Sequence, residues 1–324
     1  MKKIAVMTSG GDAPGMNACV RAVVRYGMNA GVNVLGIQRG FSGLMNNDII
    51  EMDSRSVGGI IRLGGTILMS ARALEFKTPE GQQRALETLS AWGIEGVVVI
   101  GGDGSLCGAR TLYELGVPVI GVPASIDNDI GCTEMSIGVD TALNTILDAV
   151  DKIKDTASAH QRAFIIEVMG RRHGYLALMS GVAGGAELII LPNTKIDPVY
   201  ISKEVKTASL RGKPHFIIIV AEGAEMEGQE SVTAKIAHVV KDAGFDPRVT
   251  VLGHVQRGGS PTAFDRLLGT RFGAKAVENL LAGESGTMTC LLADHIITKP
   301  LEEVLSTKVQ LRDDILALVQ PLAR

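Results

Sequence analysis

The chain has 324 residues, of which 46% are hydrophobic and 21% are charged, and its formal net charge is −3. This length suits two domains, or one large domain with a smaller one, and the composition excludes disorder as the main state. The charge gives no support to a nucleic-acid partner. The four cysteines are widely spaced and form no Cys-x-x-Cys pair, which excludes a disulfide framework and a zinc site of that kind.

The amino-terminal stretch MKKIAVMTSGGD has an apolar run that is too short for a signal peptide, and glycines end it. The longest apolar runs, such as residues 216–221, are far shorter than a membrane span. We therefore expect reduced thiols, a cytoplasmic location and no membrane partner.

Short runs rich in Val and Ile alternate with segments of helical length. We predict strands at residues 3–7, 33–37, 97–100, 118–122, 163–168, 188–191 and 216–221. Runs that are apolar at consecutive positions are typical of parallel strands covered on both faces. Residues 139–156 repeat apolar side chains at helical spacing, which predicts a long helix. The alternation indicates an α/β fold with mostly parallel sheets, in which ligands bind beyond the carboxyl ends of the strands.

The stretch VVVIGGDGS joins one of these strands to a helix. Gly101, Gly102 and Gly104 have no Cβ, so we expect them to adopt positive φ and to let backbone amides approach an anion. We expect Ser105 to cap the helix, whose amino end favours negative charge. Asp103 would repel phosphate unless a cation lay between them, and Mg²⁺ binds few carboxylates together with phosphate oxygens. A tight strand-to-helix turn with a capping aspartate explains the loop equally well.

A second glycine-rich loop, SGGD at residues 9–12, also joins a strand to a helix. The two loops together predict a shared phosphate site, in which Gly11 offers its backbone amide. The alternative is a sharp turn, with Pro14 near the first turn of the helix. The chain contains no G-x-x-x-x-G-K-[ST] motif, so it is not a P-loop enzyme. It contains no G-x-G-x-x-G followed by a ribose-binding acid, which weakens dinucleotide binding as an explanation.

Acidic residues follow two further strands. Phosphoryl transfer to an alcohol needs a base near the hydroxyl and a metal on the phosphates. We assign the base to Asp127, and we expect Asp129 to hold metal-bound waters or to orient its neighbour. Ser125 is placed to hydrogen-bond to a transferring phosphate, and Glu222 to accept sugar hydroxyls. The alternatives are an Asx-turn with exposed acids and, for the glutamate, a helix cap or salt bridge.

Basic residues stand at the ends of apolar runs. Arg162 precedes the predicted strand at 163–168, and Arg171 follows it. A second group surrounds the run VTVLG and consists of Arg248, His254 and Arg257. Arginine forks match the geometry of phosphate, so an anionic substrate is the simplest explanation. Ordinary salt bridges, and a core position for the histidine, are the alternatives.

The motifs resemble those of one family along nearly the whole chain. In order they are TSGGDAPGMNA, GGT…SAR, GGDGS, IDNDI, GVDTALNTI, HQR, EVMGR, GGAE, AEG and VLGHVQRGGSPTAFDR. This series is similar to that of the bacterial ATP-dependent 6-phosphofructokinases. GGDG alone is shared by NAD kinases and lipid kinases, but an enzyme of the NAD-kinase type leaves HQR, EVMGR and GHVQRGG unexplained.

The resemblance implies that MgATP and fructose 6-phosphate give ADP and fructose 1,6-bisphosphate, a step of glycolysis. It implies two Rossmann-like α/β domains with mostly parallel sheets and the active site in the cleft between them. Residues 1–138 with about 257–310 would form the ATP-binding domain, and about 139–256 with 311–324 the sugar-phosphate-binding domain. The resemblance also implies an obligate homo-oligomer, usually a tetramer.

Roles for individual residues follow from the resemblance. Asp127 would deprotonate the sugar 1-hydroxyl, with help from Asp129 and Ser125, and Arg72 and Arg171 would offset charge on the transferring group. Asp103 would lie toward Mg²⁺. The residues in contact with ATP would be Gly11, Arg72, Ala73, Gly102, Asp103, Gly104 and Ser105. Those around the sugar phosphate would be Ser125, Ile126, Asp127, Met169, Gly170, Arg171, Glu222, His254, Val255, Gln256 and Arg257, joined from a neighbouring subunit by Arg162 and Arg248 at the 6-phosphate.

A regulatory site is implied as well, at which ADP or GDP would activate and phosphoenolpyruvate would inhibit. Arg21 and Arg25 lie one helical turn apart, so both can face one anion. A basic patch facing solvent is the alternative. The full set of implied effector residues is Arg21, Ala22, Val23, Val24, Arg25, Lys154, Gly185, Ala186, Glu187, Arg211, Lys213, Pro214 and His215.

Some positions depart from the family pattern. Ala124-Ser125 stands where Gly-Thr is common, but the serine keeps a hydroxyl. Pyrophosphate-dependent relatives commonly carry Asp in place of Gly104 and Lys in place of Ala124, so Gly104 favours ATP. The alternatives are a pyrophosphate-dependent enzyme and a non-catalytic sensor of sugar phosphate and nucleotide, although a sensor needs no base.

The implied effector site departs further. Ser54 and Lys154 stand where arginine is usual, and Gly59 stands where aspartate is common. The loss of an arginine fork weakens bidentate anion binding, so we expect these departures to weaken the binding of an effector. The segment 224–230 is a few residues longer than the pattern, and a second sugar such as tagatose 6-phosphate fits the same motifs.

Overall fold

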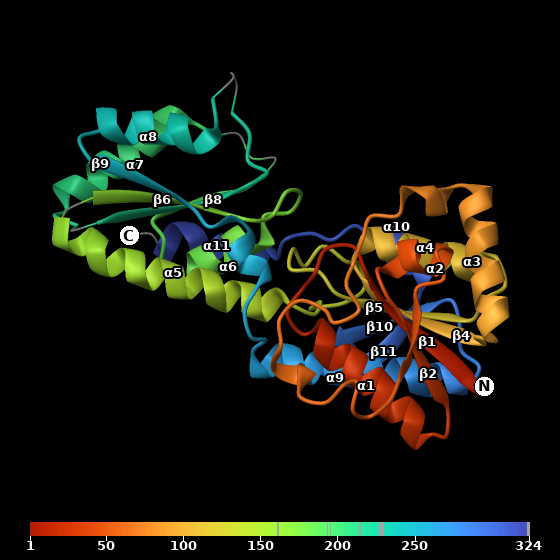
Figure 1. Ribbon diagram of the computed structural model, residues 1–324. Helices are drawn as coiled ribbons and strands as arrows, with labels where there is room; N and C mark the ends of the chain where they lie inside the picture. Colours follow the sequence, from red (N-terminus) through yellow and green to blue (C-terminus); the bar gives the residue numbers. More distant parts are fainter. Residues whose placement is uncertain (161, 193, 195, 214, 227–229, 323–324) are drawn as a thin grey trace. The chain divides into compact units, whose positions relative to one another are not determined.

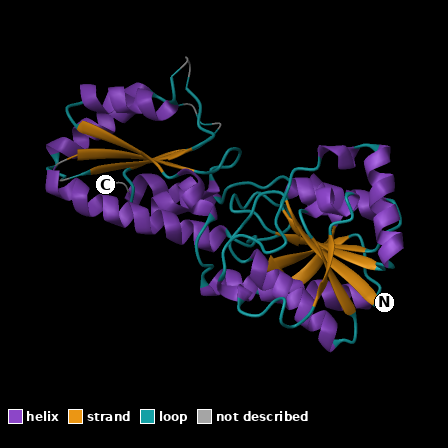
Figure 2. Cartoon of the chain, viewed as in Figure 1, coloured by secondary structure: helices purple, strands orange, loops and turns teal. Residues whose placement is uncertain are grey.

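The computed structural model describes residues 1–322 except 161, 193, 195, 214 and 227–229 (Figure 1). The chain divides into two compact units. Unit 1 comprises Met1–Thr141 and Arg257–Val309, and unit 2 comprises Ala142–Gln256 and Gln310–Arg324. Each unit has its own sheet, covered by helices, and its own apolar core (Figure 2).

A seven-stranded sheet forms the centre of unit 1, in the order β11-β10-β5-β4-β1-β2-β3. The five inner strands are parallel, whereas β3 and β11 pair antiparallel at the two edges. Helices on both faces bury the inner strands, which explains their continuous Val and Ile runs. The strands are β1 Lys3–Ser9, β2 Asn33–Ile37, β3 Ile49–Met52, β4 Gly96–Gly101, β5 Val119–Pro123, β10 Thr287–Leu292 and β11 His295–Pro300.

Two layers of helices enclose this sheet (Figure 1). α1 packs along α9 on one face, and α2, α3, α4 and α10 cover the other. The core under the second group includes Met7, Leu35, Val97 and Leu106. The elements are α1 Met16–Asn29, α2 Gly40–Met45, η1 Ile60–Arg62, η2 Leu74–Lys77, α3 Pro79–Trp92, α4 Asp103–Glu114, α9 Ala263–Leu281 and α10 Leu301–Ser306.

Unit 2 contains a four-stranded parallel sheet in the order β7-β8-β6-β9. The apolar faces of α7 and α8 pack on one side of it, over a core that includes Ile165, Phe216 and Ile218. The elements are α5 Val139–His160, β6 Arg162–Val168, α6 Tyr175–Ala183, β7 Leu188–Ile190, α7 Pro198–Leu210, β8 Phe216–Ala221, α8 Val232–Asp242, β9 Asp246–Val251, η3 Gly253–Arg257 and α11 Asp313–Leu322.

The predicted α/β class with mostly parallel sheets is confirmed. All seven predicted strands are present, and the helix predicted at 139–156 extends to residue 160 as α5. β3, β9, β10 and β11 were not predicted, and all but β10 are edge strands with mostly part-exposed side chains. In the part of the chain that the structure describes, no helix combines the length and the apolarity needed to cross a membrane.

Candidate active site

A pocket of about 400 Å³ lies at the carboxyl ends of β1, β4 and β5 in unit 1. Its lining brings together both predicted phosphate loops, Arg72, and the loop that carries Asp127. Carboxyl ends of parallel strands are where α/β proteins bind ligands. The lining residues are Ser9, Gly10, Gly11, Phe41, Ala71, Arg72, Ala73, Leu74, Phe76, Lys77, Gly102, Asp103, Gly104, Ser105, Cys107, Gly108, Thr111, Ala124, Ser125, Asp127 and Arg257.

The loop after β4 differs from its prediction in two ways. α4 begins at Asp103, and its N-cap is Gly102 with φ −87, so Ser105 lies inside the first turn and does not cap the helix. None of the three glycines Gly101, Gly102 and Gly104 has a positive φ, contrary to the prediction. The strand therefore continues into the helix without a left-handed residue. Gly101 is required for close packing instead, since a Cβ there would lie 2.4 Å from the Ser9 carbonyl oxygen.

Gly104 has no such packing reason. A Cβ at this position would meet no protein atom within 4 Å. The residue lies in the first turn of α4, where glycine is among the least favourable residues, and it lines the pocket. The empty space above Gly104 is therefore available to a ligand that occupies the pocket.

The loop after β1 is bent by Gly10, which has φ +82. Behind it, the Arg257 Nη1 donates to the Asp12 carbonyl oxygen at 3.3 Å. A Cβ on Gly11 would lie 2.7 Å from the same Arg257 nitrogen. Arg257 was predicted among the residues around the sugar phosphate, and its guanidinium supports the glycine loop of unit 1.

Buried polar side chains hold the segment that leads to Arg72. The side chain of Asn17, on α1, donates to the carbonyl oxygens of Leu63 and Gly64, both at 3.1 Å. Its Oδ1 accepts from the Ile67 amide at 2.8 Å. Thr8 Oγ1, on β1, donates to the Met69 carbonyl oxygen at 2.8 Å, and Met69 has φ 58. These contacts fix the backbone just before Arg72, and they were not predicted from the sequence.

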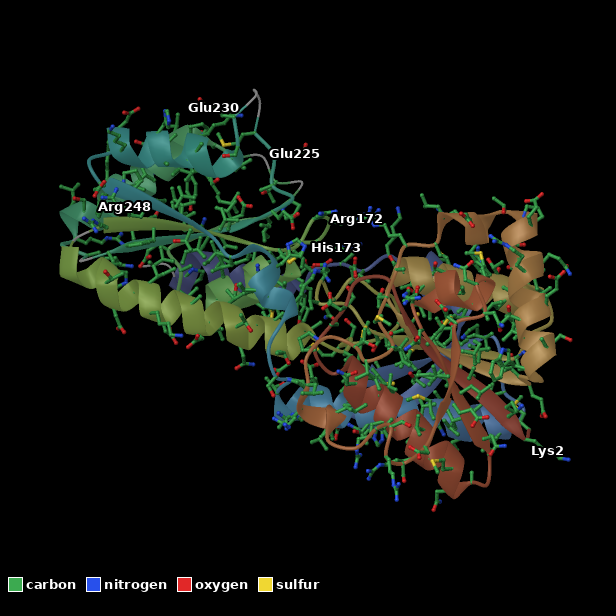
Figure 3. All side chains as sticks on the ribbon, in the orientation of Figure 1. Lys2, Arg172, His173, Glu225, Glu230 and Arg248 are labelled. Carbon is green, nitrogen blue, oxygen red and sulfur yellow. The ribbon has the colours of Figure 1, made fainter. Side chains whose placement is uncertain are left out.

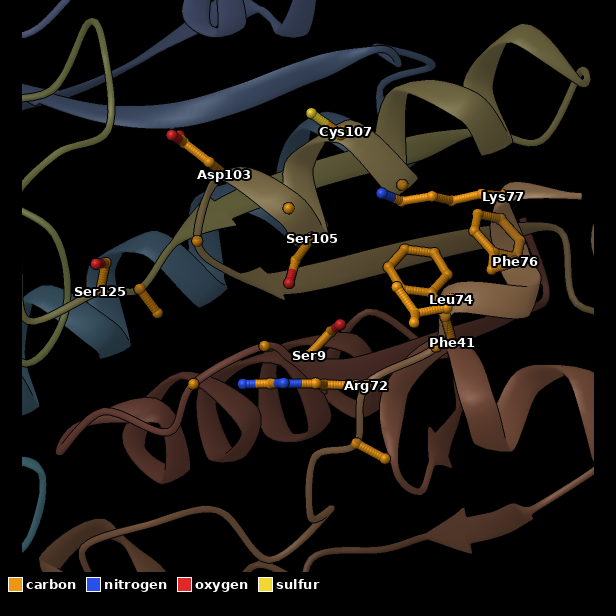
Figure 4. A pocket seen from close by; sticks show the side chains of 18 of the residues that line it. Ser9, Phe41, Arg72, Leu74, Phe76, Lys77, Asp103, Ser105, Cys107 and Ser125 are labelled. Carbon is orange, nitrogen blue, oxygen red and sulfur yellow. The ribbon is translucent and has the colours of Figure 1, made fainter. Parts of the chain in front are cut away.

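The pocket has a polar end and an apolar end (Figure 4). Asp103 and Ser125 lie at one end, whereas Phe41, Phe76 and Lys77 lie at the other. The two phenylalanine rings are stacked, with centroids 4.4 Å apart. The two rings make this end suit a flat ring, and Lys77 adds one cation beside them. Phe41, Phe76 and Lys77 were not predicted, because no motif marks them as ligand-binding residues.

The loop after β5 carries the predicted base. Ser125 Oγ donates to Asp129 Oδ1 at 3.1 Å and accepts from the Asp127 amide at 3.3 Å. The serine hydroxyl, predicted to bind a transferring phosphate, therefore also organises its own loop. The neighbouring Ile126 was predicted to contact the sugar, but its side chain is fully buried.

In unit 2, Arg171 and Glu222 meet at the carboxyl end of the sheet. Arg171 Nε lies 3.0 Å from Glu222 Oε1. Burial raises the pKa of Glu167, on β6; the charge of Glu222 adds to this, and a hydrogen bond from Thr233 opposes it. The cation and acid predicted to hold the sugar are thus neighbours, and a second carboxylate lies close behind them.

The segments beside this pair are also fixed by hydrogen bonds. The Met169 amide donates to Gln256 Oε1 at 3.1 Å, and Gln256 Nε2 donates to the Gly253 carbonyl oxygen at 2.9 Å. Gln256 is fully buried, so its side chain serves the fold, whereas Val255 and His254 are exposed on η3. Gly170 has φ +124, which turns the chain toward Arg171.

Arg162 and Arg248 lie at the opposite end of the same sheet. Arg162 Nε is 3.2 Å and Arg248 Nη2 is 2.8 Å from Asp246 Oδ2, so one carboxylate holds both arginines. Figure 3 shows Arg248 far along the sheet from Arg172 and His173, which follow β6. The seven residues of β6 separate the two ends by about 20 Å. Within one chain, therefore, these arginines are remote from Arg171.

The implied effector residues are found in both units. Ala22, Val23 and Val24 are buried on α1, which leaves the side chains of Arg21 and Arg25 to face a ligand. The remaining residues lie in unit 2, where Lys154 contacts the turn at Gly184 and Gly185, and Glu187 pairs with Lys213. We call these residues the cluster around Glu187. Pro214 lies outside the described residues.

The centre of that cluster is Glu187, which is buried. Its Oε1 lies 3.1 Å from Lys213 Nζ, and its Oε2 accepts from the Ile217 amide at 2.6 Å. Lys154 Nζ donates to the Gly184 carbonyl oxygen.

Gly59, in unit 1, stands where the family pattern commonly has aspartate. Its φ is +72, a left-handed conformation that glycine adopts easily, which explains glycine at this position.

Among the described residues, no three His, Cys, Asp or Glu side chains gather as ligands for a metal ion. Two carboxylates, Asp103 and Asp127, line the pocket. Mg²⁺ is commonly held by one or two carboxylates plus phosphate oxygens and water. The donor set therefore fits a magnesium ion that arrives with a nucleotide better than a metal held by protein alone.

A glycine-lined pocket at the ends of parallel strands, with arginines and carboxylates around it, defines a phosphate-binding α/β protein. Residues 3–280 match the family model described as phosphofructokinase. The chain belongs to the phosphofructokinase family.

Individual relatives agree with this assignment. The chain is 54% identical to the ATP-dependent 6-phosphofructokinase of Thermotoga neapolitana, over 95% of both chains. It is 39% identical to a solved phosphofructokinase from Saccharomyces cerevisiae, with a TM-score of 0.87, and the match covers 94% of this chain and 45% of the yeast chain. A pyrophosphate-dependent phosphofructokinase from Marinobacter aquaeolei is 24% identical, with a TM-score of 0.87 over 100% of this chain and 92% of that chain, which shows the fold alone.

Proposed function

We propose that this chain transfers the terminal phosphoryl group of ATP to the 1-hydroxyl of fructose 6-phosphate, giving ADP and fructose 1,6-bisphosphate. The observation that carries the proposal is the unit 1 pocket, which joins a glycine-lined phosphate end to a stacked aromatic end. Relatives that are 50–54% identical to this chain, such as that of Thermotoga neapolitana, bear the name of this activity.

ATP is favoured over pyrophosphate as the donor by both ends of the pocket. The open space above Gly104 leaves room for the α-phosphate of a nucleotide. Phe41 and Phe76 are almost fully buried, but their edges line the pocket and are apolar, which suits an adenine ring, and pyrophosphate has no group to fill that end. Mg²⁺ would be held by Asp103, and when bound it would neutralise charge on the phosphates.

The chemistry needs a base, a positioned donor and compensating charge. Asp127 would take the proton of the 1-hydroxyl while that oxygen bonds to the terminal phosphorus and the bond to ADP breaks. Arg72 and Arg171 would offset the charge that spreads over the transferring group. Asp129, through the Ser125 hydroxyl, would keep the loop of the base in place.

In unit 2, the sugar phosphate would be held by Arg171 and Glu222 at the carboxyl end of the sheet. Arg162 and Arg248 lie about 20 Å away along β6, further than one sugar phosphate reaches. We therefore propose that they bind the 6-phosphate of a neighbouring subunit, which makes the enzyme a homo-oligomer, with a tetramer as the expected state. β9, which carries Arg248, is an edge strand with Val249 and Val251 exposed.

Regulation is proposed at the cluster around Glu187. Arg21, Arg25, Lys213 and Arg211 would bind the phosphates of ADP or GDP as activator, or phosphoenolpyruvate as inhibitor. The ion pair between the buried Glu187 and the part-exposed Lys213 supports a prepared site. Ser54 and Lys154, which stand where arginine is usual, would weaken it.

The test is phosphorus NMR of the purified protein with Mg²⁺ and fructose 6-phosphate, with ATP in one sample and pyrophosphate in another. We expect fructose 1,6-bisphosphate with ATP only. Product with pyrophosphate only would overturn the donor assignment. Product with neither would favour a non-catalytic sensor, and binding of both ligands by calorimetry would then identify one.

The base is tested by Asp127→Ser. We expect turnover to fall by about 10²- to 10⁴-fold, the range that general-base catalysis contributes, while fructose 6-phosphate still binds. Isothermal titration calorimetry measures the binding. Unchanged turnover in this variant would remove Asp127 as the base.

A further inference from the structure

Asn128 stands between the two aspartates of the candidate site and has an unusual backbone. Its φ is 48, in the left-handed region, and its side chain is buried. Most residues other than glycine avoid this region, and asparagine tolerates it better than most. Because φ at residue 128 is reversed, the backbone direction changes immediately after Asp127.

The side chain of Asn128 makes two hydrogen bonds of 3.0 Å, and longer ones beside them, to a later segment of the same loop. Its Oδ1 accepts from the Ser136 amide at 3.0 Å, and its Nδ2 donates to the Glu134 carbonyl oxygen at 3.0 Å. Both sides of the amide are therefore used. The bonds close the loop that begins at Asp127 and ends where the chain enters α5.

That later segment is itself anchored to the sheet of unit 1. The Glu134 amide donates to the Leu291 carbonyl oxygen at 3.0 Å, and the Leu291 amide donates to Thr133 Oγ1 at 3.0 Å. Leu291 belongs to β10, a strand of the sheet. Ser136 Oγ also donates to the Ser125 carbonyl oxygen at 2.6 Å, two residues before Asp127. A continuous set of hydrogen bonds thus links β10 to both sides of Asp127.

We propose that Asn128 is a positioning residue for the reaction: its left-handed backbone aims the Asp127 carboxylate into the pocket, and its side-chain amide holds that direction against the sheet. This proposal rests on the proposed role of Asp127 as the base. Asn128 does not line the pocket and is not among the residues expected to touch substrate. Its effect is exerted through Asp127 alone.

Three substitutions separate the backbone contribution from that of the side chain. Asn128→Ala loses both hydrogen bonds and disfavours the left-handed conformation. Asn128→Gly loses the hydrogen bonds but accepts that conformation. Asn128→Asp keeps an acceptor for Ser136 and replaces the donor to Glu134 by a carboxylate. Asn47→Ala is the matched control, because Asn47 has φ 61 and accepts a hydrogen bond from Trp92 at 2.6 Å, but does not line the pocket.

We expect kcat with ATP and fructose 6-phosphate to fall about 100-fold in Asn128→Ala and about tenfold in Asn128→Gly and Asn128→Asp, since small displacements of a reacting group cost this much. Calorimetric binding of fructose 6-phosphate should stay within about twofold of the wild type. Asn47→Ala should lower the melting temperature and leave kcat unchanged. Wild-type kcat in the alanine and glycine variants would overturn the proposal, and the glycine variant decides it alone if the alanine variant does not fold.

A double-mutant cycle tests whether the effect passes through the base. In an Asp127→Ser background, Asn128→Gly should change the residual turnover by less than about twofold. A further tenfold loss in that background would overturn the proposal, because it would mean an effect independent of Asp127. The two hypotheses fail separately: normal turnover in Asp127→Ser removes the base itself, whereas collapsed turnover there with a wild-type Asn128→Gly removes only the positioning role.

Discussion

The two units hold their candidate anion-binding arginines in different ways. In unit 2, Arg171 is paired with Glu222, and Arg162 and Arg248 share Asp246. In unit 1, Arg72 is exposed in the pocket and makes no ion pair within the described part of the chain. An anion that enters the unit 1 pocket meets an available cation, whereas one that binds in unit 2 must displace a carboxylate. The unit 1 pocket therefore has a cation ready for phosphate. In unit 2, each arginine must exchange its carboxylate partner for the anion.

Arg72→Ala tests the largest expected difference between the two units, because it removes the arginine that no described residue holds in an ion pair. The variant loses the cation that offsets charge on the transferring phosphoryl group. We therefore expect kcat to fall about 10²- to 10³-fold, which is the cost of removing one charge-stabilising group. Steady-state assays with saturating ATP measure the change. Arg84→Ala is the control, because Arg84 makes an exposed ion pair with Glu75 on the same unit and does not line the pocket. Equal loss in both variants would contradict a special role for Arg72.

Arg248→Ala tests the remote pair of unit 2. We expect KM for fructose 6-phosphate to rise about 10- to 100-fold, as for the loss of a charge-assisted hydrogen bond to phosphate. Co-expression with Asp127→Ser chains should restore activity to about a quarter of the wild type, because mixed oligomers contain some sites with both residues intact. No restoration would mean that Arg248 and Asp127 serve the same site from the same chain, which contradicts the neighbouring-subunit proposal.

Gly104→Asp asks whether the open space in the pocket belongs to a nucleotide. We expect KM for ATP to rise at least about tenfold, because a carboxylate would face phosphate at close range. Gly104→Ala separates volume from charge and should have a smaller effect. The melting temperature should not fall in either variant, since glycine is unfavourable in a helix and an acid is favoured in its first turn. Unchanged KM for ATP in both variants would place the nucleotide elsewhere.

The sequence predicted those features of the two units that depend on short, continuous stretches of residues. Most buried parallel strands were predictable because both faces are covered, so their apolar runs are continuous. β10 was not, since Thr287 and Thr289 interrupt its apolar residues. β9 was not, since its edge position leaves all of its side chains exposed or part-exposed and its sequence DPRVTV has no continuous apolar run. The supposed cap at Ser105 was wrong because the helix starts two residues earlier, which depends on backbone geometry and not on residue type.

The supporting residues of the site could not be predicted for a different reason. Asn17 and Asn128 both stand in the quoted motifs, but the segments that they hold lie about 50 residues away and across a loop, so the motifs do not show these contacts. The ion pairs that distinguish the two units, such as Arg162 with Asp246, also join distant positions. A motif identifies which side chains could act, but the fold decides which of them already has a partner.

Asp246→Asn gives the smallest and most discriminating effect. Asp246 is about half exposed, so its ion pairs with Arg162 and Arg248 contribute little to stability, within about 1 kcal/mol. If the carboxylate competes with the 6-phosphate, its removal should lower KM for fructose 6-phosphate by about threefold and leave KM for ATP unchanged. Asp148→Asn, which removes an exposed ion pair with Lys152 on α5, is the control and should change neither constant. A raised KM would mean instead that Asp246 is needed to hold the arginines in place. The carboxylate would then prepare the unit 2 arginines for the anion, whereas in unit 1 Arg72 is ready without an acidic partner among the described residues.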